Sequence, residues 1–290
     1  MPLAPLDQVS INHLQLGAES SEAGRAPLVF VHGLATSLAF WMPTVQHLAE
    51  DRPMVLFDLR GHGRSTMPAG GYTPARMADD LEDLLDRLRI PSAVVVGHSF
   101  GGSVALHFAC RRPERVSRLI LADARLRLLQ PRQSPSDWPH WATLQERLER
   151  LGIVVGEDEP EGGYRILTEM ARLQVRAIDT QETIPRWLAG FYGGGTSTYA
   201  AARWLELLET TSAWRDITGP ESISEEDLRG LEMPTLAVYG EISPVLPTAE
   251  ALRALWPRLV FRSVPGAGHF FPLSQAALFA GLMHEFLEGP

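Results

Sequence analysis

The first 122 residues alternate short apolar runs with amphipathic stretches, and this alternation constrains the fold more than any other feature of the chain. Apolar runs bounded by turn residues are typical of buried parallel strands, because both faces of such strands are covered. The predicted strands are APLVFVHG (26–33), PMVLFDLRG (53–61), SAVVVGHS (92–99) and RVSRLILADA (115–124). Strands that alternate with helices form βαβ units, so we expect a parallel sheet with helices on both faces.

The amphipathic stretches carry helix signals. TPARMADDLEDLLDRLRI begins with Thr73 as an N-cap and Pro74 at the first helical position, and its apolar residues fall on one face. Further helices are predicted over SLAFWMPTVQHLAE (37–50) and QAALFAGLMHEFLE (275–288).

The middle of the chain breaks the alternation. Between residues 125 and 231 helical patterns replace the strand-like runs. The predicted helices there are TLQERLERLGI (143–153), YRILTEMARLQVRAI (164–178), IPRWLAGFYG (184–193) and TYAAARWLELLETTSAW (198–214), with Gly193–Gly195 as a loop. Because strands resume with PTLAVYGE (234–241), we expect one α/β core, residues 1–124 and 232–290, with a helical insertion at 125–231.

The composition argues against several classes of protein. A formal net charge of −9 argues against a nucleic-acid-binding surface, which needs a basic patch. No run approaches the roughly 18 apolar residues of a membrane-spanning helix, and the N-terminus has no signal-peptide pattern. The single cysteine, Cys110, cannot form an internal disulfide, so we expect a cytoplasmic protein. The chain has no lysine, which excludes Schiff-base chemistry, and we expect no metal and no cofactor.

Ser99 lies in Gly97-His98-Ser99-Phe100-Gly101, where a strand pattern gives way to a helix pattern. Glycines in G-x-S-x-G allow a sharp turn that lifts the serine hydroxyl above the sheet at a helix N-terminus. A serine nucleophile needs a base, and His269, in a Gly-rich loop before the last helix, has the best setting. The backbone N–H groups of Leu34 and Phe100 are the candidates for an oxyanion hole.

Four motifs in order resemble the α/β-hydrolase fold superfamily: VFVHGLATS, FDLRGHGRS, VVVGHSFGG and PGAGHFFP. The resemblance covers nearly the whole chain outside 125–231. It implies a mostly parallel sheet of the eight-stranded type with a helical cap inserted after strand six. It also implies a Ser-His-acid triad, with Ser99 as nucleophile and His269 as base.

The acid of that triad is absent from its usual place. Most of the superfamily carries it just after strand seven, and the matching residue here is Ser243. Asp123 ends the predicted strand six, next to the nucleophile strand, and some members of the superfamily carry their acid there. We therefore favour Asp123; Glu241 and the lack of any acid are the alternatives.

These residues predict a serine hydrolase of the esterase or thioesterase type, acting through an acyl-enzyme on a small to medium, largely apolar acyl compound such as an ester, thioester or lactone. We expect His32, Trp138 and Trp141 to contact the substrate. The alternatives on the same fold are a C–C bond hydrolase and a decarboxylating thioesterase. An alternative of another class is a non-catalytic small-molecule receptor, which the serine at position 243 favours.

Overall fold

The computed structural model describes residues 3–6, 8–17, 25–48, 52–131, 134–138, 141–180 and 197–289. Its strands form one eight-stranded sheet in the order β1-β2-β4-β3-β5-β6-β7-β8. They are β1 (Leu3–Pro5), β2 (Ser10–Leu16), β3 (Leu28–Val31), β4 (Met54–Phe57), β5 (Ala93–His98), β6 (Val116–Ala122), β7 (Thr235–Gly240) and β8 (Val260–Val264). β1 and β2 pair antiparallel to their neighbours, and all the other pairs are parallel, so the predicted mostly parallel sheet is confirmed.

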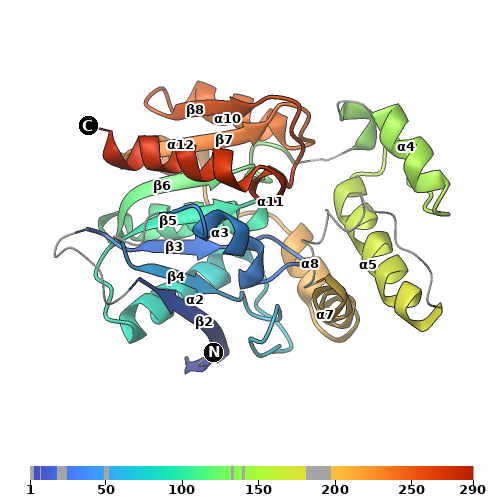
Figure 1. Cartoon of the computed structure of the whole chain (residues 1–290), viewed down its shortest axis with the longest axis horizontal. Coiled ribbons are helices and arrows are strands. Elements are labelled where there is room, and N and C mark those ends of the chain that lie inside the picture. The colour runs from blue at the N-terminus through green and yellow to red at the C-terminus, as the bar shows by residue number, and fades with distance from the viewer. Residues whose placement is uncertain are drawn as a thin grey trace.

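Helices cover both faces of this sheet (Figure 1). α2 (Pro74–Arg87), α3 (Phe100–Arg111) and α10 (Leu246–Leu255) pack on one face, and α1 (Met42–Val45) and α12 (Ala276–Glu288) pack on the other. The pleat of β5 divides its side chains accordingly: Val95 belongs to the first core, whereas Val94 and Val96 belong to the second. Both faces of the central strands are therefore buried, as their continuous apolar runs predict.

One predicted helix needs correction, and some elements of the structure were not predicted. In place of the helix predicted over 37–50, residues 37–48 form a 3-10 turn, η1 (Leu38–Trp41), followed by the single turn α1, because Pro43 lacks the N–H that a continuous helix would need. The short helix α11 (Phe271–Ser274) precedes the last helix, α12. The strands β1 and β2 had no prediction, since β2 (SINHLQL) is not a continuous apolar run.

The described elements between β6 and β7 are η3 (Pro135–Asp137), α4 (Trp141–Glu149), α5 (Gly162–Thr180), α7 (Ser197–Thr210), α8 (Ala213–Thr218) and α9 (Glu225–Arg229). Four helices of the 125–231 segment, α4, α5, α7 and α8, lie beyond one end of the sheet (Figure 1), whereas α9 contacts α3 and α10. The helix predicted over 184–193 and the loop predicted at Gly193–Gly195 fall outside the described residues. Within the described residues, no helix combines the length and the apolar character that crossing a membrane requires.

The glycines around Ser99 allow β5, β3 and α3 to approach closely. A Cβ added to Gly97 would lie 2.5 Å from the carbonyl oxygen of Gly101. A Cβ added to Gly101 would lie 2.4 Å from the carbonyl oxygens of both Val31 and His32. These neighbours are backbone atoms of buried elements, so a side chain cannot be accommodated by a simple rotamer change.

We predict that Gly101→Ala destabilises the protein by at least about 2 kcal/mol, because it forces α3 away from the end of β3. The matched control is Gly281→Ala in α12, where an added Cβ meets no heavy atom within 4 Å. That control is expected to stabilise by about 0.5–1 kcal/mol through helix propensity. Urea denaturation of both variants measures the difference, and equal effects would contradict the packing argument.

Candidate active site

Ser99 lies between β5 and α3 in a strained backbone conformation. Its φ is 53° and its ψ is −122°, values that non-glycine residues rarely adopt. Backbone hydrogen bonds on both sides hold it: Ser99 N–H donates to Ala122 O at 3.1 Å, and Gly102 N–H donates to Ser99 O at 2.9 Å. The sharp turn predicted from the glycines is therefore present.

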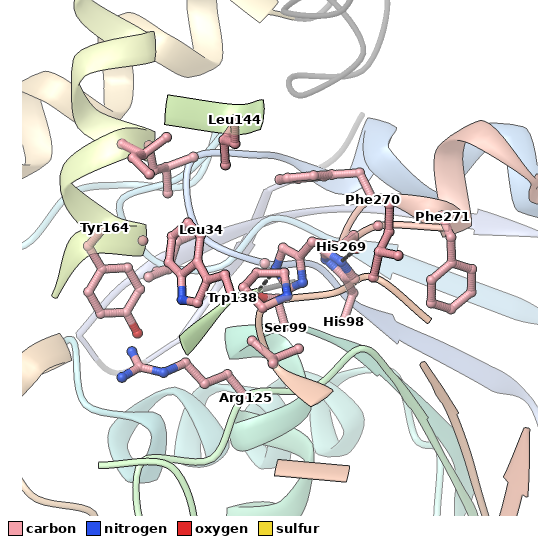
Figure 2. A pocket seen from close by; sticks show the side chains of 18 of the residues that line it. Leu34, His98, Ser99, Arg125, Trp138, Leu144, Tyr164, His269, Phe270 and Phe271 are labelled. Carbon is pink, nitrogen blue, oxygen red and sulfur yellow. Dashed lines mark hydrogen bonds between the residues drawn. The ribbon is translucent and has the colours of Figure 1, made fainter. Parts of the chain in front are cut away.

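His269 lies beside Ser99 at the cavity (Figure 2) and is hydrogen-bonded to both Ser99 and Asp123. The distance from Ser99 Oγ to His269 Nε2 is 2.9 Å, and that from His269 Nδ1 to Asp123 Oδ2 is 2.7 Å. Because a carboxylate only accepts, Nδ1 carries the proton, and Nε2 is left to accept from the serine hydroxyl. The ring is held from behind by His98, whose Nε2–H donates to His269 O at 2.9 Å.

Asp123 is fully buried and has several donors. It follows β6 directly, with φ 49°. Its Oδ1 accepts the Gly240 N–H at 2.8 Å, and its Oδ2 accepts the Ser243 hydroxyl as well as the His269 Nδ1–H. Ser243, at the vacant acid position, is thus a hydrogen-bond partner of the carboxylate that contacts His269.

The alternative acid, Glu241, has a different environment. Its side chain is exposed, and its Oε2 accepts the Gly266 N–H at 2.8 Å in the loop after β8. Of the two carboxylates considered from the sequence, Asp123 is therefore the one hydrogen-bonded to His269.

The two amides expected at the oxyanion hole have no acceptor among the described residues. Phe100 is the first residue of α3, so its N–H has no partner within the helix. The Leu34 N–H belongs to the peptide whose carbonyl, Gly33 O, accepts from His32 Nδ1 and from Thr36 Oγ1, both at 2.7 Å. Since N–H and C=O point in opposite directions across a trans peptide, these two bonds orient the Leu34 amide.

His32 was predicted to contact the substrate, but the structure places its side chain elsewhere. The ring is fully buried and does not line the cavity. Its Nε2 accepts the Leu59 N–H at 3.0 Å while Nδ1 donates to Gly33 O. Burial lowers the pKa of His32 to about 4, so the ring stays neutral, with one donor and one acceptor nitrogen.

A cavity of about 630 Å³ opens beside Ser99 and His269 (Figure 2). Its walls come from the core and from α4 and α5, and they are mainly apolar: Leu34, Trp138, Leu144, Ile166, Leu167, Ile242, Val245, Phe270 and Phe271. Trp138 is one of the lining residues, and its contact with the substrate stays a prediction. Trp141 does not line the cavity, because it packs edge-on against Trp138 at 5.7 Å between ring centroids.

Comparisons with known proteins identify the fold. The model of the α/β-hydrolase fold family matches residues 26–151. Carboxylesterase CesB from Bacillus subtilis superposes with a TM-score of 0.68 over 99% of this chain and 91% of its own, at 19% identity. Together with the sheet order, these matches confirm the resemblance seen in the sequence: the chain has the α/β-hydrolase fold.

Two sequence relatives differ in coverage. 2-Hydroxymuconate semialdehyde hydrolase from Pseudomonas sp. (strain CF600) is 28% identical over 90% of this chain and 86% of its own length. An abhydrolase domain-containing protein of Caenorhabditis elegans is 33% identical over 41% of this chain. The chain spans only 28% of that protein and 38–39% of three other curated relatives.

A second polar cluster, which the sequence analysis missed, lies under α3 around Glu221. Glu221 accepts the Arg127 N–H at 2.7 Å and the Ser103 hydroxyl at 3.3 Å, and His107 Nε2 lies 3.9 Å away. His107 Nδ1–H donates to Ser103 O at 2.8 Å. In the neutral ring, Nε2 therefore carries no proton and presents its lone pair to Glu221. Ser103 and His107, polar residues four apart on the buried face of a helix, were the available sequence signal.

Burial raises the pKa of Glu221 to about 7, with the neighbouring Arg127 and Arg125 opposing the shift. The unfolded carboxyl ionises near pH 4.5, so between about pH 4.5 and 7 the unfolded state loses its proton first. The contribution of Glu221 to stability therefore falls as pH rises through this window, by up to about 3 kcal/mol.

We predict that Glu221→Gln removes this fall, because an amide of the same shape carries no charge at any pH. The exposed Glu226→Gln is the control and is expected to keep the wild-type pH profile. Denaturation free energies from pH 4 to 8 measure the effect, and an unchanged profile in Glu221→Gln would exclude the assignment.

Proposed function

We propose that the chain is a serine hydrolase that cleaves a carboxylic ester or a related acyl compound through an acyl-enzyme. The observation that carries the proposal is the continuous hydrogen-bonded row of Ser99, His269 and Asp123 at the wall of an apolar cavity. The hydrolase names of relatives on this fold support it. The helices of the 125–231 segment act as a cap in this proposal, since α4 and α5 contribute lining residues.

The proposed mechanism follows from the polarity of these hydrogen bonds. Ser99 Oγ attacks the acyl carbonyl while its proton passes to His269 Nε2, and Asp123 stabilises the imidazolium through Nδ1–H. The Leu34 and Phe100 amides donate to the developing oxyanion. The leaving group takes the proton from Nε2, and water then repeats the same steps to release the acid.

A C–C bond hydrolase is the second candidate. The similarity to 2-hydroxymuconate semialdehyde hydrolase over 90% of the chain favours it. Comparing kcat/KM for a ring-fission dienone with that for simple aryl esters separates the two reactions. A thioesterase or lactonase differs from an esterase only in the acyl compound, and a cytoplasmic location stays a prediction.

The first test is labelling of Ser99 by a fluorophosphonate, followed by intact mass. We predict rapid labelling of the wild type and of Glu241→Gln, because that carboxylate does not touch His269. Asp123→Asn is expected to label slower by orders of magnitude, since an Asp→Asn change in another serine triad costs about 10⁴ in kcat. Slower labelling of Glu241→Gln alone would show that Glu241, and not Asp123, is the acid of the triad. A folded wild type that is not labelled would favour the receptor alternative.

The second test moves the carboxylate of the triad from position 123 to position 243. Ser243 already contacts the Asp123 carboxylate, so an aspartate at 243 can bring a carboxylate close to His269. We predict that Asp123→Asn/Ser243→Asp labels at least about tenfold faster than Asp123→Asn, because charge at the imidazolium is restored. Asp123→Asn/Ser243→Asn is the control of matched shape, and equal rates in the two double variants would contradict the proposal.

A further inference from the structure

Arg125 forms part of the cavity wall near Ser99. Its backbone N–H donates to Ser99 O at 3.3 Å, and its side chain is only 4% exposed. The guanidinium lies 5.0 Å from the ring centroid of Tyr164, on the side of the cavity away from His269 and Phe271 (Figure 2). Stacking on an aromatic face holds the plane of a guanidinium while leaving its edge free to donate.

The pairing of Arg125 is poor for a buried cation. Its Nη1 lies 3.5 Å from Glu161 Oε2 and its Nη2 lies 3.5 Å from Gln130 O, both at the outer limit of a hydrogen bond. Its Nε is buried without a partner among the described residues. Arg60, another guanidinium that is almost fully buried, shows what complete pairing looks like: two bonds of 2.5 Å to Asp80 and one of 3.2 Å to Gly70 O.

The nearby acids are committed to other partners. Glu161 forms its closer ion pair with Arg127 and only the 3.5 Å contact with Arg125. Glu221 accepts from the Arg127 N–H and the Ser103 hydroxyl, and burial raises its pKa to about 7, so it is only partly ionised at neutral pH. The cluster of Arg125, Arg127, Glu161 and Glu221 therefore keeps an excess of positive charge, which favours an anion beside Arg125.

We propose that Arg125 binds a carboxylate on the substrate, so that the enzyme acts on anionic acyl compounds in which a carboxylate and the scissile carbonyl are joined by an apolar segment. The inference rests on the proposed function and adds a substrate class to it. A guanidinium and a carboxylate form parallel, charge-assisted hydrogen bonds, which the long contacts to Glu161 and Gln130 do not supply. The cavity that both Arg125 and Ser99 line has mainly apolar walls, which suit the joining segment.

Arg147 is the rival cation at this cavity. It lies on α4 and its side chain is exposed, so water and salt screen its charge. A preference that depends on the buried Arg125 is expected to persist at 0.5 M salt, on the order of three times the physiological ionic strength, whereas one that depends on Arg147 is expected to vanish there.

The test compares kcat/KM within two pairs of esters. The first pair, mono-(4-nitrophenyl) glutarate and 4-nitrophenyl pentanoate, places the charge on the acyl side. The second pair, 4-acetoxybenzoate and its methyl ester, places it on the leaving group. We expect the wild type to prefer the anionic member of at least one pair by about tenfold or more. Arg125→Gln is expected to lose that preference, Arg125→Lys to retain part of it, and Arg147→Gln to retain it.

Binding gives a readout that does not depend on turnover. Ser99→Ala is expected to bind monomethyl glutarate at least about tenfold more tightly than Ser99→Ala/Arg125→Gln, as measured by calorimetry. No anionic preference in the wild type, or loss of the preference in Arg147→Gln but not in Arg125→Gln, overturns the proposal. Failure of the proposed function appears separately, as absence of fluorophosphonate labelling at Ser99, and the calorimetric comparison still tests Arg125 in that case.

Discussion

The site depends on the hydrogen bonding of the buried Asp123 carboxylate. The carboxylate is fully buried, and a buried charge is tolerated only when hydrogen bonds replace its lost water. Three donors do so: the Gly240 amide, the Ser243 hydroxyl and His269 Nδ1–H. Two of them come from the end of β7, so the same bonds that hold the charge also tie β7 to β6 and fix the direction in which the carboxylate meets His269.

The register of the sheet sets the spacing of the site. Ser99 N–H donates to Ala122 O and Asp123 N–H donates to Val238 O, so each turn residue continues the hydrogen-bond ladder to the next strand. Ser99 and Asp123 both have positive φ, and these backbone bonds keep them in that strained conformation. A shift of one residue in the strand register would move Ser99 and Asp123 apart. The buried apolar runs of β5, β6 and β7 fix this register and thereby the geometry of the site.

Local signals explain which features could be predicted. The position of Ser99 could be predicted because its sharp turn needs glycines next to it in the sequence. The close packing of Gly101 against Val31 and His32 shows why a side chain is not tolerated there. Predicting that Asp123 lies near the site required one more step of inference, namely that strands five and six are neighbours in the parallel sheet. His32 was expected to contact the substrate, but its ring turns inward to the Leu59 N–H, and no local sequence pattern encodes that direction.

Contacts between distant segments account for what the sequence could not supply. Glu221 meets Ser103 and His107 across more than a hundred residues, and Ser243 meets Asp123 in the same way. Such pairs have no spacing rule, because the fold rather than the local backbone brings them together. The serine at 243 looked like a missing acid in the sequence, whereas in the structure it is a donor to the carboxylate.

The absence of lysine bears on the buried cations of this fold. A buried ammonium readily loses its proton, since burial lowers the pKa of lysine, whereas a guanidinium stays charged. At Arg60 the retained charge is satisfied internally by Asp80, and the result is a structural ion pair. At Arg125 the same chemistry, with its internal partners at 3.5 Å, leaves a permanent cation with unused donors at the cavity wall. The two arginines differ in their acceptors and not in their own chemistry, so the distribution of carboxylates around them separates a structural cation from one that can bind a ligand.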